Sequence, residues 1–254
     1  GQVLDHMFFD GLQNPDDGLM MGVFGERCAE KFNFTREQQD AFSIASIERA
    51  LAAMEGQFAA EISPVTVKSR RGESVITEDQ EPPSCNIGKI PSLRAAFKKD
   101  GTVTAASSSK ISDGAAATVL MSAEKAAEMG LTPLATIVAH STYSQDPEWF
   151  TTAPIGATEK VLQRAGWSVG DVDLYEVNEA FATVTMAAMH ELNIDHDKMN
   201  INGGACALGH PIGASGARVV VTLINALRQR GLKKGVAALC IGGGEATALA
   251  IELP

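Results

Sequence analysis

An α/β layered fold is the class that the sequence predicts, because strand-like and helix-like segments alternate along its second half. Strands are expected over residues 134–139, 172–177, 236–241 and 247–251. Helices are expected over residues 157–165, 179–192 and 214–230, with Gly231 ending the last of them. The chain has 254 residues, of which 45% are hydrophobic, so it can bury a sizeable core.

Helices and irregular segments are expected in residues 1–110. Thr35 and Gln38 have the spacing of a capping box, which predicts a helix that runs past Leu51 and stops at Gly56. A short strand is expected over residues 65–67, followed by a basic turn over 68–72. The prolines at 82 and 83 predict a loop.

Composition and charge exclude several classes of protein. The formal net charge of −10 argues against general nucleic-acid binding. No run of residues approaches the roughly 20 apolar residues of a membrane span, so we expect no membrane partner. Residues 1–10 lack a basic start and an apolar core, so we expect no signal peptide and a cytoplasmic location.

The cysteines and histidines indicate no metal site. Cys28, Cys85, Cys206 and Cys240 do not form a Cys-x-x-Cys pair, and the five histidines are scattered without acidic or cysteine neighbours at ligand spacing. Free thiols of this kind are usually buried in proteins of a reducing compartment.

Two glycine-rich stretches carry the residues best suited to chemistry. His210 lies in the loop of residues 203–216, directly before an expected helix, and Cys240 ends an apolar strand at Gly242–Gly244. Glycines let a backbone approach a ligand closely. An imidazole and a thiol together suit acyl transfer. Alone, the histidine would be interpreted as a loop residue and the cysteine as a core residue.

These stretches resemble the thiolase family, which comprises acetyl-CoA acetyltransferases and 3-ketoacyl-CoA thiolases. Residues 177–181 are similar to its Asn-Glu-Ala-Phe motif, and residues 101–105 with 112–117 are similar to its Gly-Thr-Val-Thr-Ala and Asn-Asp-Gly-Ala-Ala segments. Four motifs occur in the family's order across most of the chain, which makes a chance resemblance very improbable.

The resemblance implies an αβαβα layered fold made of two similar halves, with a loop domain inserted in the first half. By this analogy residues 1–110 are most of the loop domain. Residues 111–130 are the last strand and helix of the N-terminal half, with the strand over residues 116–121. Residues 131–254 are the complete C-terminal domain.

The resemblance also implies catalytic roles for four residues. Cys240 matches the acid/base that deprotonates the second acyl-CoA and protonates the leaving group. His210 matches the histidine that activates the nucleophilic cysteine and donates to the thioester oxygen. Asn178 matches the asparagine that positions a water in one oxyanion hole, and it also has the place of a helix N-cap. Gly242 matches the backbone N–H of the other oxyanion hole.

Four further residues match positions that line the acyl or pantetheine tunnel of the family: Ser109, Phe97, Phe181 and Met21. We expect the helix after His210 to disfavour its imidazolium form. We also expect a neighbouring imidazole to lower the pKa of the catalytic thiol.

Several positions depart from the family's pattern. Residues 106–110 read Ala-Ser-Ser-Ser-Lys where Gly-Asn-Ala-Ser-Gly is common, and Pro82 and Pro83 stand where many members carry an arginine that meets the CoA nucleotide. Lys68, Arg70, Arg71 or Lys89 are possible substitutes. Met20 replaces a histidine of many short-chain members. Acyl-chain length therefore stays open.

The resemblance implies an acyltransferase of fatty acid metabolism that interconverts acyl-CoA plus acetyl-CoA with 3-ketoacyl-CoA plus CoA, by Claisen condensation or thiolysis. No cofactor is implied beyond the CoA thioesters themselves. The family's acyl-accepting cysteine has no counterpart here, so an N-terminal thiolase segment is an expected partner, and this chain alone is expected to be inactive. A homodimer or homotetramer is implied.

Two alternative functions are compatible with parts of this pattern. One is a non-catalytic acyl-CoA or lipid-binding thiolase-like module. The other is a relative of the β-ketoacyl synthases, which use paired histidines without a second cysteine; the single His210 and the Cys240-Ile-Gly-Gly-Gly motif argue against it.

Overall fold

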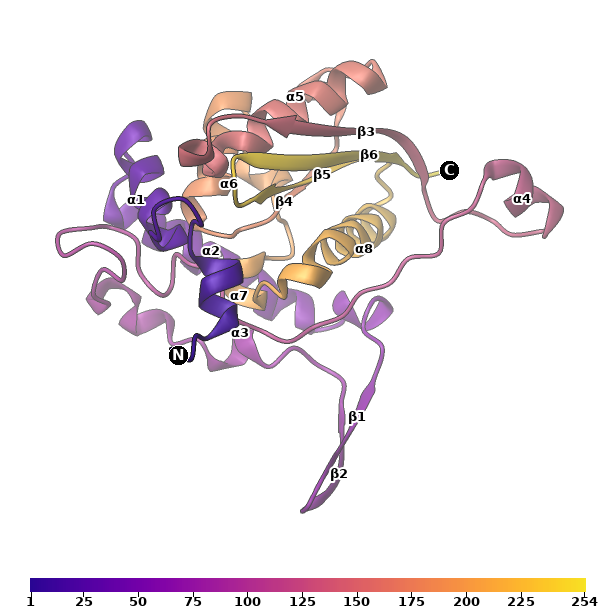
Figure 1. The fold of residues 1–254 in the computed structure, drawn as a ribbon. Coiled ribbons are helices and arrows are strands. Elements are labelled where there is room, and N and C mark those ends of the chain that lie inside the picture. The colour runs from indigo at the N-terminus through magenta and orange to yellow at the C-terminus, as the bar shows by residue number, and fades with distance from the viewer.

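A computed structural model describes residues 1–254, and its second half is a sheet covered by helices on both faces (Figure 1). The sheet has the strand order β3-β6-β5-β4. β4 and β5 are parallel, whereas the other neighbours are antiparallel. The strands are β3 (Thr136–Ser144), β4 (Leu174–Val177), β5 (Lys234–Ile241) and β6 (Glu245–Glu252). The expected α/β layers are therefore confirmed.

Three helices cover this sheet. α5 (Ala153–Ala165) and α6 (Ala182–Leu192) bury their apolar sides on one face, together with β4, β5 and β6. α8 (Ile212–Arg230) packs on the other face, where Leu223 and Leu227 meet Leu174 and Ala237. Gly231 ends α8 in a left-handed conformation, as its place in the sequence predicted.

The first half contains two longer helices and a hairpin that projects from the body of the molecule (Figure 1). Its helices are α1 (Met21–Phe32), α2 (Arg36–Met54), α3 (Glu81–Ser84) and α4 (Ala123–Glu128), and its strands are β1 (Val65–Ser69) and β2 (Gly72–Ile76). α7 (Ala205–Leu208) lies in the second half. The remaining elements are a π-helix, Met7–Leu12, and 3-10 helices at Phe58–Ala60, Ile87–Ser92, Pro147–Thr152, Val169–Asp171 and His196–Lys198.

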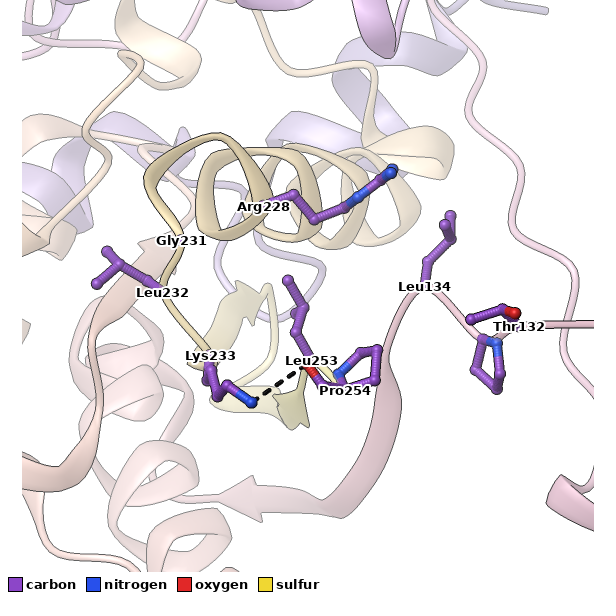
Figure 2. Close-up of a pocket in the computed structure, with 9 residues that line it drawn as sticks. Thr132, Leu134, Arg228, Gly231, Leu232, Lys233, Leu253 and Pro254 are labelled. Atoms are coloured by element: carbon purple, nitrogen blue, oxygen red, sulfur yellow. Dashed lines mark hydrogen bonds between the residues drawn. The ribbon is translucent and has the colours of Figure 1, made fainter.

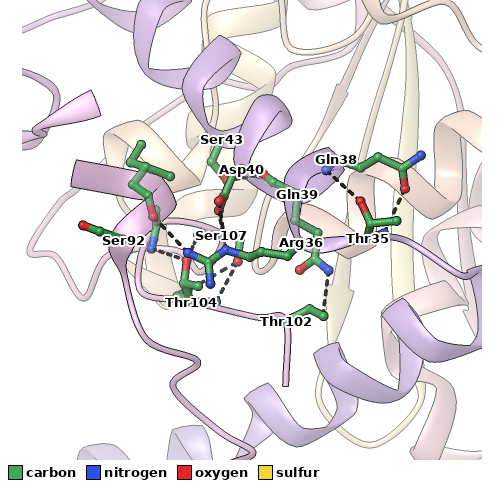
Figure 3. Close-up of polar contacts among 12 residues, drawn as sticks. Thr35, Arg36, Gln38, Gln39, Asp40, Ser43, Ser92, Thr102, Thr104 and Ser107 are labelled. Carbon is green, nitrogen blue, oxygen red and sulfur yellow. Dashed lines mark hydrogen bonds and ion pairs between the residues drawn. The ribbon is translucent and has the colours of Figure 1, made fainter. Parts of the chain in front are cut away.

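The start of α2 organises the first half. Thr35 and Gln38 form both bonds of the predicted capping box. Arg36 binds Asp40 with its Nε and the backbone oxygen of Ile90 with its Nη2, as Figure 3 shows. Gln39 Nε2 donates to Thr102 Oγ1 at 2.8 Å. These contacts attach the segment 90–109 to one rigid helix.

Three expectations about local structure were wrong. No strand forms over residues 116–121, which lie outside every helix and strand, because nothing in this chain pairs with their backbone. α6 begins at Ala182 instead of residue 179, with Phe181 as its N-cap, since Asn178 N still bonds β5. The expected proline loop is the short helix α3, whose first turn tolerates proline.

No helix of this chain is both long and apolar enough to cross a lipid bilayer.

Candidate active site

The ends of β4 and β5 bring Asn178 and Cys240 to one edge of the sheet. The strands are parallel with Val177 opposite Ala238, and Asn178 N donates to Ala238 O at 2.9 Å. Asn178 is 1% exposed, and neither its Nδ2 nor its Oδ1 has a hydrogen-bond partner. Because a buried amide without partners is costly, this side chain is suited to hold a water or a ligand oxygen.

Cys240 points into an apolar cluster. Its buried neighbours there include Phe24, Val103 and Phe181, and Met21 and Phe97 pack against the same group. Burial raises the pKa of the Cys240 thiol to about 12. The expected lowering by an imidazole is therefore wrong for this chain, because removal from water dominates the thiol's surroundings.

The predicted tunnel residues gather around this thiol. The rings of Phe97 and Phe181 meet edge to face, with centroids 5.9 Å apart. Phe97 fits only because Gly22 of α1 has no side chain: a Cβ there would lie 2.3 Å from the ring. A Cβ on Gly242 would lie 3.6 Å from the Met21 side chain. The tunnel residues Met21, Phe97 and Phe181 thus lie close to Cys240 and Gly242.

Backbone hydrogen bonds of Ser109 and Lys110 connect the surroundings of Cys240 to the loop that carries His210. Ser109 N donates to Ala180 O at 3.0 Å, and Lys110 O accepts from His210 N at 2.9 Å. The Ser109 side chain is only half-buried and makes no hydrogen bond. Its part in binding a substrate stays a prediction.

His210 precedes α8 and is held by its first turn. Nδ1 lies 2.5 Å from Ser215 Oγ, which donates its own hydrogen to Pro211 O at 3.1 Å. The serine oxygen therefore accepts from Nδ1–H, which leaves Nε2 with a free lone pair. Burial, and then the charge of Arg218, lower the pKa of His210 to about 4. The imidazole is neutral as predicted, but burial rather than the helix end is the main cause.

Both halves of the chain match thiolase domains. The family model described as "Thiolase, N-terminal domain" matches residues 1–124, and that described as "Thiolase, C-terminal domain" matches residues 131–253. An acetyl-CoA acetyltransferase of Chromobacterium violaceum is 48% identical over all of this chain, which covers 65% of that relative. A probable acetyl-CoA acetyltransferase of Dictyostelium discoideum is 49% identical, with 98% of this chain and 61% of the relative covered.

Two solved structures have the same fold as this chain over nearly its whole length. The acetyl-CoA acetyltransferase of Bacillus anthracis has a TM-score of 0.95 at 44% identity, covering 100% of this chain and 66% of its own. Human mitochondrial 3-ketoacyl-CoA thiolase has a TM-score of 0.92 at 35% identity, covering 99% and 64%. This chain belongs to the thiolase family. It spans 61–65% of the length of the two curated relatives named above.

One residue of this thiolase chain that motif reasoning passed over is Glu179. Its carboxylate is 1% exposed and accepts from Ser46 Oγ at 2.7 Å, Cys206 N at 3.0 Å and Asn200 Nδ2 at 2.8 Å. It thus joins α2, the end of β4 and the short helix α7 that leads to His210. The signal in the sequence was a charged residue within the Asn-Glu-Ala-Phe motif, two positions after the end of β4.

A hollow at the other end of α8 lies far from this thiolase site. Arg228, Lys233, Leu253 and Pro254 are among its lining residues, as Figure 2 shows. Sixteen helical residues at 1.5 Å each place Arg228 about 25 Å from the start of α8. The hollow is therefore not part of the site around His210.

No three His, Cys, Asp or Glu side chains gather as a metal site.

Proposed function

We propose that this chain provides the histidine, the second cysteine and the asparagine of a thiolase active site. The reaction would interconvert acyl-CoA plus acetyl-CoA with 3-ketoacyl-CoA plus CoA. The observation that carries the proposal is the unpartnered, buried amide of Asn178 at the same sheet edge as Cys240. Relatives named acetyl-CoA acetyltransferase support it.

In the condensation direction, an acyl group held on a thiol of an N-terminal segment would meet a second acyl-CoA. Cys240 would remove the proton α to the second thioester, and Asn178 would orient a water toward the enolate oxygen. A carbon–carbon bond then forms while the bond from the acyl carbon to the enzyme sulfur breaks, which returns a thiolate. No oxidation state changes, so the reaction needs no redox cofactor.

Two groups would serve the acyl-transfer step. The free Nε2 lone pair of His210 would take the proton of the acyl-accepting thiol. The Gly242 N–H would donate to the oxyanion of the tetrahedral adduct. Phe97, Phe181, Met21 and Ser109 would line the path of the acyl chain or the pantetheine arm.

The protonation state of Cys240 also supports the proposal. With a pKa of about 12, its thiol carries a proton at neutral pH. A protonated thiol is the form that protonates a leaving enolate during thiolysis. Condensation needs the thiolate as a base. The proton of Cys240 must therefore be removed once the N-terminal segment has completed the site.

The proposal is tested by joining this chain to an N-terminal thiolase segment that carries the acyl-accepting cysteine. The chain alone should neither cleave acetoacetyl-CoA nor stay monomeric, because Val119 and Leu120 are 86% and 72% exposed. The segment, fused or added in trans, should restore both solubility and turnover. A soluble monomer of residues 1–254 that cleaves acetoacetyl-CoA would overturn the proposal.

A second candidate function is a non-catalytic acyl-CoA-binding module. The burial of Cys240, which is 8% exposed, is the observation that favours it. The two candidates separate in the joined protein: a module binds acetyl-CoA without forming an acyl-enzyme, whereas the enzyme gains the mass of one acetyl group.

A further inference from the structure

One side of α8 carries a polar stripe that begins beside His210. Its members recur every three or four residues and therefore lie on one face of the helix: Ser215, Arg218, Thr222, Asn225 and Gln229. The apolar residues of the helix face the sheet instead. Each stripe residue contacts another part of the chain, so the stripe forms a polar seam along the helix.

Arg218 in this stripe faces a fully buried carboxylate. Glu176 takes a position in β4 that alternation assigns to the α8 face, alongside Leu174. Arg218 Nη1 lies 3.5 Å from Glu176 Oε2, and Glu176 is 1% exposed. Neither oxygen of Glu176 has a hydrogen-bond partner. Burial raises the pKa of Glu176 to about 8, and the charge of Arg218 is the largest influence that opposes this rise. The guanidinium therefore favours the ionised form of a carboxyl group that burial alone would keep protonated.

The charge of the same guanidinium also acts on two further carboxyl groups. Glu61 accepts from Thr222 Oγ1 at 3.3 Å and from Asn225 Nδ2 at 3.2 Å. Burial raises the pKa of Glu61 and of Asp79, and the charge of Arg218 opposes that rise in both. Arg218 thus forms an ion pair with Glu176, and its charge also acts on the Glu61 and Asp79 carboxyl groups.

The same cation acts on His210. Ser215, which binds the imidazole Nδ1, lies one helical turn before Arg218. Lys110 also approaches the histidine loop, but its backbone oxygen makes that contact and its ammonium donates to Ala105 O at 2.8 Å. Asp113 lies beside Pro211 in a surface hollow. Among these charges, Arg218 is the one that lowers the pKa of His210.

We propose that Arg218 is a positioning residue for the acyl-transfer site. Its contact with Glu176 ties the helix that follows His210 to the strand that ends at Asn178, two structures that carry separate parts of the site. Its positive charge also adds to the effect of burial in disfavouring a protonated imidazole, because a second positive charge nearby is unfavourable. The inference rests on the proposed function and adds to it a group that touches no substrate.

The test compares four variants of the protein joined to its N-terminal segment: Arg218→Met, Arg218→Lys, Glu176→Gln and the double change of Arg218→Met with Glu176→Gln. Arg228→Met is the matched control, since it removes an exposed arginine from the far end of the same helix. Each protein is assayed for acetoacetyl-CoA cleavage from pH 3.5 to pH 9, because the pKa of His210 is about 4. NMR follows the titration of the His210 imidazole.

Arg218→Met should lower kcat by about tenfold to a hundredfold while KM changes much less, because the reacting groups are misplaced but still present. Without the guanidinium the imidazole takes up a proton more readily, so the acid limb of kcat/KM should move up by about one pH unit. Arg218→Lys keeps the charge and should leave that limb in place. Glu176→Gln should lower kcat without raising the limb.

The outcomes decide between positioning and simple support of the fold. The inference is overturned if the acid limb of kcat/KM does not move in Arg218→Met, whether kcat stays at the wild-type value or falls. If Arg218→Met does not fold, the double variant serves in its place, because it does not leave the Glu176 carboxylate buried without its ion-pair partner. If the wild-type protein transfers no acyl group, the proposed function fails; the inference then stands or falls on whether Arg218→Met raises the His210 titration midpoint.

Discussion

The loop that carries His210 and the strand end that carries Cys240 bury their functional groups in different surroundings. Burial lowers the pKa of the imidazole to about 4 and raises that of the thiol to about 12, so both groups are neutral at pH 7. A neutral imidazole is a base, whereas a neutral thiol is an acid. In the proposed reaction, the same physical cause would therefore prepare the two groups for opposite steps.

The neighbours of the two groups explain how each is controlled. His210 has a polar partner in Ser215 and a cation in Arg218. Cys240 is enclosed by aromatic and aliphatic side chains such as Phe181 and Val103. The pKa of the imidazole therefore responds to a charge within this chain. The surroundings of the thiol must change before the thiol can act as a base.

The largest expected effect comes from removing the thiol. Cys240→Ser in the joined protein should lower turnover by about 10²–10⁴-fold, because a hydroxyl is a far weaker acid than a thiol and, at neutral pH, a far weaker base than a thiolate. Acylation by acetyl-CoA should persist, since it does not use this group. A burst assay beside steady-state turnover measures both, and near-normal turnover would remove Cys240 from the mechanism.

The histidine side of the comparison predicts a broader defect. His210→Ala should slow both half-reactions, because nucleophile activation and oxyanion stabilisation both depend on the imidazole. Loss of one such donor typically costs about 10²–10³ in rate. Rapid-quench measurement of acyl-enzyme formation tests this. Acylation at the wild-type rate would mean that His210 only shapes its loop.

The low pKa of His210 should appear as an acid sensitivity of the fold. The folded-state pKa of about 4 lies below the ordinary value of 6.5, so protonation favours the unfolded state. Stability should therefore fall as the pH drops from 6.5 toward 4, and at pH 4 this group costs about 3 kcal/mol. Above pH 6.5 it has no such effect.

Urea unfolding of the joined protein and its His210→Gln variant, at pH 8 and pH 4, measures that contribution. Between pH 8 and pH 4, the free energy of unfolding of the variant should rise by about 3 kcal/mol relative to that of the wild type. Equal pH dependence of the two proteins would show that burial does not hold the imidazole neutral.

The smallest effect is expected from the hydrogen bond that sets the tautomer. Ser215→Ala removes the acceptor of the Nδ1 proton and should lower kcat by about tenfold, the equivalent of one good hydrogen bond at about 1.4 kcal/mol. Ser215→Thr retains a hydroxyl and is the matched control. Unchanged kcat in the alanine variant would show that Nδ1 has another partner during the reaction.

Local signals in the sequence determined much of this structure. The Thr35–Gln38 capping box, the long apolar stretch of α8 and the strands on either side of Gly242–Gly244 all form as predicted. These features depend on residues within a few positions of one another, so a single segment contains the information. The order of the motifs along the sequence likewise indicates the thiolase family, which the family models confirm.

Other features depended on residues distant in the sequence. The strand expected over 116–121 does not form, because strand formation requires a neighbour that local pattern cannot supply. The roles of Glu179 and Arg218 arise from contacts with α2, β4 and the loop at Glu61. The sequence by itself determined which groups could do acyl chemistry. Tertiary structure alone decided their protonation, because a pKa depends on burial and on charges brought close only by the folded chain.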